Sequence, residues 1–193
     1  MLWQVFTESL DIAYQACQGA RSYLTKVYFE REAIVLSQLY ETLISTLVRF
    51  ASCFIFILFL GKISLGGTLI VAASFACAIA LGLGIGLLLL PMLLLFSDTY
   101  NLLRLFTSYG LFITSAFYAP NPDTGGIFNS LIQHNPLSYI MTSAREAAAG
   151  TSLDNLPALA IISGASLLTI IGGRALLNLS IPIIIERMLL GGR

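Results

Sequence analysis

Long apolar stretches separated by short polar breaks dominate the sequence. A helix crosses the hydrocarbon core of a bilayer with roughly 20 predominantly apolar residues. Four stretches meet this requirement or come close to it, and we predict a membrane-spanning helix in each of them: 42–61, 67–96, 102–119 and 156–180. The second is longer than one crossing needs, because it extends about 45 Å as a helix, so it is expected to tilt, bend or protrude. Its three glycines are spaced to let another helix approach closely: Gly82, Gly84 and Gly86.

The first segment, 3–24, has a different pattern. Its polar residues recur at steps of three and four: Gln4, Glu8, Asp11, Gln15, Gln18 and Ser22. Such steps keep polar side chains on one face of a helix. One interpretation is an amphipathic helix lying in the membrane interface. The other is a spanning helix whose polar stripe faces water in a pore, since intramembrane carboxylates face a cavity or a partner. The pattern alone leaves both open.

Two further segments are predicted not to cross the bilayer. Residues 25–41 hold the densest cluster of charge and are expected to form a polar loop or short helix. Residues 120–155 combine turn-forming residues with two semi-apolar pieces, 126–134 and 136–149, each too short to cross. The two pieces suit a re-entrant pair of half-helices with Asn135-Pro136 as the hinge.

Composition supports a membrane location and narrows the function. The 193 residues are 57% hydrophobic and 10% charged, with a mean hydropathy of +0.87, whereas soluble domains average about 25% charged residues. The net charge of zero provides no basic field for nucleic acid. Three scattered cysteines and one histidine predict no metal or disulfide site. The first four residues also lack the basic leader of a secretory signal.

The distribution of positive charge predicts the orientation, because cytoplasmic segments are rich in Lys and Arg. If 25–41 is cytoplasmic, the polar break at 97–101 and the C-terminal tail are cytoplasmic as well. That side then holds most of the cations: Arg21, Lys26, Arg31, Arg49, Arg104, Arg187 and Arg193. The outer side holds Lys62 and Arg145 and includes the re-entrant region 120–155.

Several short motifs, in this order, resemble the membrane subunit of ABC exporters for polysaccharides, teichoic-acid-type polymers and lipopolysaccharide O-chains. The start of the chain, Trp3-Gln4-Val5-Phe6 with Glu8-Ser9-Leu10, is similar to the family's Trp-x-Phe-Phe-x-Glu-Ser. Lys26-Val27-Tyr28-Phe29-Glu30-Arg31-Glu32 resembles its cytoplasmic-loop signature Lys-Val-Tyr-Phe-Pro-Arg-Glu. Ser115-Ala116-Phe117-Tyr118 and Asn135-Pro136-Leu137, followed by Arg145 and Gly150, resemble its outer motifs, and Ile181-Pro182 to Glu186-Arg187 its last cytoplasmic segment.

The resemblance implies an all-α integral membrane protein of the bacterial cytoplasmic (inner) membrane, with four to five transmembrane helices and a re-entrant pair on the outer side. The chain would form a single permease domain, 1–193, and dimerise. A separate cytoplasmic subunit would bind ATP and Mg²⁺, because this sequence has no Gly-x-x-x-x-Gly-Lys-Ser/Thr loop and is not expected to be an enzyme. The expected partners are that ATP-binding subunit, a second copy, membrane lipid and a lipid-linked glycan.

The expected functional residues fall into three groups. Coupling to the ATPase is assigned to Lys26, Tyr28, Phe29, Glu30, Arg31 and Glu32. The polymer pathway is assigned to the stripe and nearby aromatic residues, which offer sugars hydrogen bonds and flat surfaces: Trp3, Gln4, Phe6, Glu8, Asp11, Gln15 and Gln18. An outer gate is assigned to Phe117, Tyr118, Asn135, Pro136, Tyr139 and Arg145.

Departures from the family pattern keep alternatives open. Glu30 replaces a proline, Ala116 replaces another, and the family's interfacial helix and first span have no counterpart before Trp3. The alternatives are an ABC-type exporter of drugs or lipids, and a truncated membrane assembly subunit that does not transport. A membrane-embedded enzyme is disfavoured because Asp98, His134 and Glu146 are far apart in the sequence.

Overall fold

The apolar stretch after residue 64 forms the central helix, α3 (Leu65–Leu95), of the computed structural model. The structure describes residues 1–24, 31–59, 65–115, 126–150 and 155–190, and for 19–24, 31–38, 56–57, 59, 97, 127–128 and 181–190 the backbone alone. All secondary structure in these ranges is helical. The other elements are α1 (Leu2–Leu24), α2 (Arg31–Phe59), α4 (Ser97–Gly110), the 3-10 turn η1 (Leu111–Ile113), α5 (Ile127–His134), α6 (Pro136–Ala149) and α7 (Leu156–Leu190).

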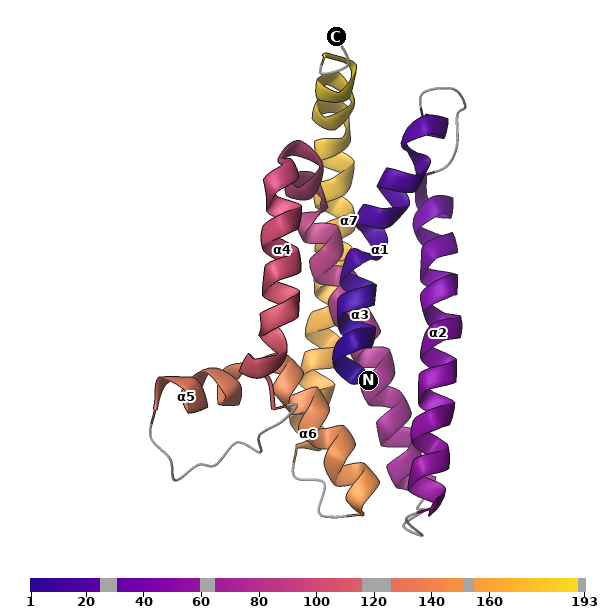
Figure 1. Cartoon of the computed structure of the whole chain (residues 1–193), viewed down its shortest axis with the longest axis vertical. Coiled ribbons are helices and arrows are strands. Elements are labelled where there is room, and N and C mark those ends of the chain that lie inside the picture. Colours follow the sequence, from indigo (N-terminus) through magenta and orange to yellow (C-terminus); the bar gives the residue numbers. More distant parts are fainter. Residues whose placement is uncertain (25–30, 60–64, 116–125, 151–154, 191–193) are drawn as a thin grey trace.

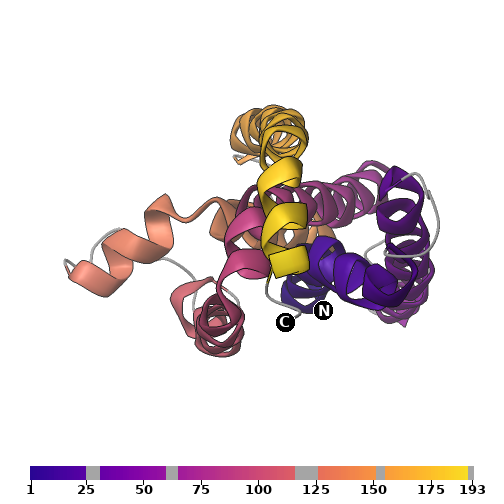
Figure 2. The ribbon, with the colours of Figure 1, turned by 90° about the horizontal axis from the view of Figure 1, so that it is seen from above.

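Helix α3 lies between α1 and α7, and both pack closely along it (Figures 1 and 2). Helix α2 packs beside α1 at one edge of the bundle, and α4 stands at another. Along the bundle axis the helices alternate in direction. The C-terminal ends of α1 and α7, the start of α2 and the α3–α4 junction therefore lie at one end of the molecule.

Glycines in α3 allow these close approaches, as the sequence predicted. A Cβ atom on Gly82 would lie 2.5 Å from the carbonyl oxygen of Phe6 in α1, and one on Gly86 would meet the carbonyl oxygen of Leu10. On another side of α3, a Cβ on Gly84 would meet the hydroxyl of Thr169 in α7. Backbones that approach this closely leave no room for a side chain. The glycines therefore fix α1 and α7 against α3.

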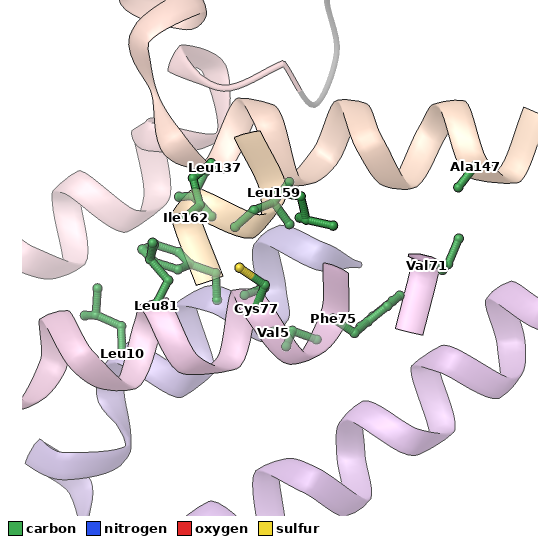
Figure 3. Packing of buried hydrophobic residues seen from close by; sticks show 13 residues of the cluster. Val5, Leu10, Val71, Phe75, Cys77, Leu81, Leu137, Ala147, Leu159 and Ile162 are labelled. Carbon is green, nitrogen blue, oxygen red and sulfur yellow. The ribbon is translucent and has the colours of Figure 1, made fainter. Parts of the chain in front are cut away.

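The core contains residues from α1, α3, α6 and α7 (Figure 3). It includes Val5 and Leu10 from α1 and Phe75 and Leu81 from α3. Cys77 belongs to it as well, whereas Cys17 and Cys53 are half-buried, and none of the three cysteines forms a disulfide bond. No group of metal-binding side chains occurs within the described ranges.

Two described helices are long and apolar enough to cross a membrane: α3, and α7 from Leu156 to Ser180. Because α3 is central and more than half buried, its apolar character is also typical of a core helix. Helix α7 differs, since large apolar side chains such as Leu168 (70% exposed), Ile171 and Leu179 face outward. An exposed apolar surface of this extent is typical of contact with lipid or with a protein partner.

Three helix boundaries differ from the sequence predictions. Helix α2 starts at Arg31, so 31–41 is helical and continuous with the predicted span; this segment contains no Gly or Pro to stop a helix. Helix α4 starts at Ser97 and ends at Gly110, well short of the predicted 102–119. Its 14 residues extend about 21 Å, less than the roughly 30 Å of a hydrocarbon core. Helix α7 continues past residue 180 to Leu190.

Two short helices, α5 and α6, occupy the region of the predicted half-helices. Asn135 lies between them in an extended conformation, and its side-chain oxygen accepts a 3.1 Å hydrogen bond from the backbone N–H of Leu137. Pro136 follows at the first helical position, where proline is well tolerated. Helix α6 packs against α3, while α5 projects away from the bundle (Figures 1 and 2).

Candidate functional site

The polar residues of α1 lie on the side of the helix that faces away from α3. The opposite side is buried through Val5, Ser9, Ile12, Ala13 and Ala16, with the Ser9 hydroxyl satisfied by the carbonyl oxygen of Val5 at 2.6 Å. Gln4, Gln15 and Gln18 are exposed, and Glu8 and Asp11 are half-buried. We call Gln4, Glu8, Asp11, Gln15 and Gln18 the polar face of α1. The predicted stripe thus exists as one accessible surface on the helix.

Glu8 is held by an arginine of the neighbouring helix α2. Two nitrogens of the Arg49 guanidinium donate to the two carboxylate oxygens of Glu8, at 2.6 and 2.5 Å. This bidentate arrangement is the strongest form of carboxylate recognition available to a side chain. The distribution of positive charge assigned Arg49 to the cytoplasmic side of the membrane. The structure instead places it well inside α2 and paired with the polar face.

On the other flank, α4 meets α1 through side chains rather than through close backbone packing. The rings of Tyr14 and Tyr100 stack with centroids 4.2 Å apart and an angle of 18° between their planes. Gln18 donates to the Tyr14 hydroxyl at 2.9 Å. Asp11 lies within electrostatic reach of Arg104. The polar face is therefore bordered by α2 on one side and by an aromatic and charged seam with α4 on the other.

The two aromatic residues predicted for the pathway both make contacts within the bundle. Trp3 donates from its indole N–H to the carbonyl oxygen of Thr107 at 3.1 Å, and its ring packs where a Cβ on Gly110 would lie 2.7 Å away. Phe6 is only 6% exposed and belongs to the core. This corrects the expectation for Phe6, because its position on the helix turns it toward α3. Trp3 therefore connects the start of α1 to the C-terminal part of α4 through a hydrogen bond and ring packing.

Of the predicted outer-gate residues, four are described. Asn135 and Pro136 form the start of α6, and Tyr139 is half-buried along it. Arg145 donates to the carbonyl oxygen of Ser115 at 2.6 Å. This hydrogen bond ties α6 to the segment that follows η1.

Ser115 makes further hydrogen bonds to the same helix. Its hydroxyl donates to the carbonyl oxygen of Ser138 at 3.0 Å, and its backbone N–H donates to the Ser138 hydroxyl at 3.2 Å. The segment after η1 and the start of α6 are therefore joined by hydrogen bonds.

The remaining predicted residues lie outside the described part of the chain. They are Phe117 and Tyr118 of the outer gate, and Lys26, Tyr28, Phe29 and Glu30 of the coupling group. Arg31 and Glu32 are described for their backbone alone, which forms the first turn of α2.

The partners of the polar face are not apparent from the sequence pattern. Arg49 was visible as a cation within an apolar stretch, and intramembrane charges pair with one another. Glu8 was a visible counter-charge, although the choice between Glu8 and Asp11 needed the packing of α1. No sequence signal indicated the Tyr14–Tyr100 stack, because the two residues come from segments far apart in the chain.

Comparisons with known proteins add no assignment to this geometry. The chain matches no family model. No curated protein and no solved structure matches it significantly. The function is therefore argued from the residues themselves.

Proposed function

We propose that the chain is the transmembrane subunit of an ATP-driven ABC exporter, which moves a lipid-linked polysaccharide or related polymer across the bacterial cytoplasmic membrane. A separate cytoplasmic subunit hydrolyses ATP. The observation that carries the proposal is the accessible polar face of α1, which lies between α2 and α4 in a bundle with large exposed apolar side chains on α2, α4 and α7. The motif order of the sequence supports the same proposal.

The exposed apolar side chains on the outside of the bundle support a membrane location. Large apolar side chains face outward on α2 (Leu47, 65% exposed), α4 (Phe106, 67%) and α7 (Leu168, 70%). Exposing these apolar surfaces to water is unfavourable in free energy, whereas contact with lipid acyl chains avoids that exposure. Our proposal places α1, α2, α3 and α7 across the bilayer, with α4 entering it.

Helix α4 is too short to cross alone, and the re-entrant arrangement accounts for this. In our proposal α4 enters from the cytoplasmic side and stops within the bilayer. Helices α5 and α6 then complete the outer half, with α6 held to the end of α4 by Ser115, Ser138 and Arg145. Non-helical backbone at this depth is tolerated where protein or water covers it.

A polar face suits a glycan pathway because sugars need many hydrogen-bonding partners. The amides of Gln4, Gln15 and Gln18 are exposed and can both donate and accept. The charged groups on this face are Glu8, paired with Arg49, and Asp11, near Arg104. These arginines partner the carboxylates, and the exposed amides beside them would contact water or the glycan in the proposed pathway.

One end of the bundle contains the C-terminal ends of α1 and α7 and the start of α2 (Figure 1). The excess of Lys and Arg assigns this end to the cytoplasm. The ATP-binding subunit would therefore dock there, against the segment that contains Lys26, Phe29 and Arg31. Two copies of the chain would enclose one pathway between them.

Co-purification with an ATP-binding subunit encoded beside this chain tests the proposal. We expect the two proteins to form a stable complex, in which ATP hydrolysis is stimulated and a lipid-linked glycan moves into proteoliposomes. A complex that exports drugs or lipids but no glycan would contradict the substrate class. Binding without stimulated hydrolysis would indicate an assembly subunit, and failure to bind any such subunit would refute the exporter assignment.

A further inference from the structure

Helix α2 is attached to the bundle mainly through α1. It packs along α1 and approaches α3 at few points, one of which is the edge-to-face contact of Phe50 with Phe75, with centroids 5.8 Å apart. Helix α1, in contrast, is fixed to α3 along the glycines Gly82 and Gly86. A displacement of α2 therefore reaches the rest of the bundle by way of α1.

The ion pair between Arg49 and Glu8 is the salt bridge between α1 and α2 among the side chains that the structure describes. Arg49 lies about 27 Å along the axis from the start of α2, at 1.5 Å per residue. Its neighbours in the chain are Val48 and Phe50, so a charge at this depth needs its counter-charge. The two parallel hydrogen bonds fix both the distance and the relative orientation of the two side chains.

We infer that the Glu8–Arg49 pair transmits movement of α2 to the polar face of α1, so that both are positioning residues for transport. The inference rests on the proposed function, because the start of α2 adjoins the segment proposed to dock the ATPase. Pushing on that end moves a continuous helix of 29 residues. The two hydrogen bonds from the Arg49 guanidinium transmit this movement to Glu8, which belongs to the polar face.

Accessibility distinguishes this connection from a static packing contact. The Arg49 side chain is 23% exposed and that of Glu8 is 42% exposed. In the proposed water-filled pathway, water stabilises each charge when the two side chains separate, which a buried pair would not allow. The Gly82–Phe6 contact has no such freedom, since backbone meets backbone. The pair is thus the connection that can break and re-form during a cycle.

The test compares Glu8→Gln, Arg49→Gln and the exchanged pair E8R/R49E in the reconstituted complex. The single variants are expected to bind the ATP-binding subunit normally and to hydrolyse ATP. They should lose export per ATP by about tenfold, within the range of coupling factors between sites. The exchanged pair should recover most of the wild-type export per ATP. Ser52→Ala, an exposed change on the same helix, is the matched control and should leave the ratio unchanged.

A purely stabilising pair would lower the melting temperature of the single variants without changing export per ATP. That result, or export that is equal in wild type and single variants, would overturn the inference. Failure of the ATP-binding subunit to bind wild-type protein would instead refute the proposed function.

A second readout does not depend on transport. Spin labels at Gln15→Cys on α1 and Tyr40→Cys on α2, both exposed positions, report the distance between these helices. We expect a broader distance distribution in Glu8→Gln than in wild type, and a narrow one in the exchanged pair. Labels at Gln15 and Met92, between α1 and α3, should be unaffected. An unchanged α1–α2 distribution in Glu8→Gln would overturn the inference whatever the protein transports.

Discussion

Replacing Gly82 with alanine is expected to destabilise the bundle at the contact between α1 and α3. The new Cβ would lie 2.5 Å from the carbonyl oxygen of Phe6, 2.9 Å from Cβ of Ser9 and 3.2 Å from the backbone nitrogen of Leu10. Ordinary contact begins at 3.4 Å, so the closest approach is short by about 0.9 Å. The carbonyl belongs to the backbone of α1 and cannot rotate away. The whole helix must shift instead.

The size of the effect follows from two opposing terms. Overpacking of this kind costs about 1–3 kcal/mol. Alanine is also a better helix former than glycine by about 1 kcal/mol, which offsets part of the cost. Comparison with a glycine in open space isolates the cost of overpacking. Gly164 on α7 has no atom within 4 Å of its Cβ position, so Gly164→Ala keeps the helix gain alone. The two variants should differ by about 1–3 kcal/mol.

Thermal unfolding of the purified protein in detergent measures this difference. Trp3 is the single tryptophan, and its contact with α4 makes its fluorescence a probe of the folded bundle. For a chain of this size, 1 kcal/mol shifts the melting temperature by roughly 2–4 °C. Gly82→Ala should therefore melt at least a few degrees below Gly164→Ala. Equal melting temperatures for the two variants would refute the close approach of α1 to α3.

Two other predictions concern single contacts. Gly110→Ala places a Cβ 2.7 Å from the indole ring of Trp3; the ring should move out, and the fluorescence emission should shift to longer wavelength, whereas an unchanged spectrum would contradict the packing. Asn135→Ala removes the oxygen that accepts from the Leu137 N–H and should cost about 1 kcal/mol of unfolding free energy. Asn135→Ser, which retains a capping oxygen, should lose much less, and equal losses would refute the cap.

The sequence predicted the features that depend on local pattern. Polar residues at steps of three and four gave one exposed face on α1, and the glycines of α3 lie where helices meet. Asn135-Pro136 separates two helices, because an amide cap followed by proline favours a helix start at any depth. These properties are encoded within a few residues and need no knowledge of the neighbouring helices.

Features that depend on packing were not predictable. The predicted span 102–119 contains no proline, yet α4 ends within it, at Gly110. Trp3 packs on that glycine, and hydrogen bonds from Ser115 to Ser138 secure the chain beyond it. Both interactions join distant segments. The pairing of Glu8 with Arg49 likewise follows from how α2 lies on α1, which the periodicity of either helix leaves undetermined.

The charged segment 25–41 was predicted to be loop or short helix because of its composition. Helix α2 begins at Arg31 within it. Glu, Gln, Leu and Ala are strong helix formers, and charge alone does not end a helix. This difference matters for the proposed function, because a helix that continues from the docking end into the bundle transmits force as one rigid body.

The accessibility of the polar face in the membrane is the most direct test of the proposed pathway. Cysteines at Gln15 and Gln18 on α1, and at Leu168 on α7, are introduced one at a time into a chain whose native cysteines are replaced. Each is then exposed, in intact membranes, to a charged thiol reagent that does not enter lipid. We predict that the two α1 sites react and that Leu168→Cys, which the proposed function places against acyl chains, does not. Unreactive cysteines at both α1 positions, or reactivity at Leu168 equal to theirs, would contradict a water-filled pathway along α1.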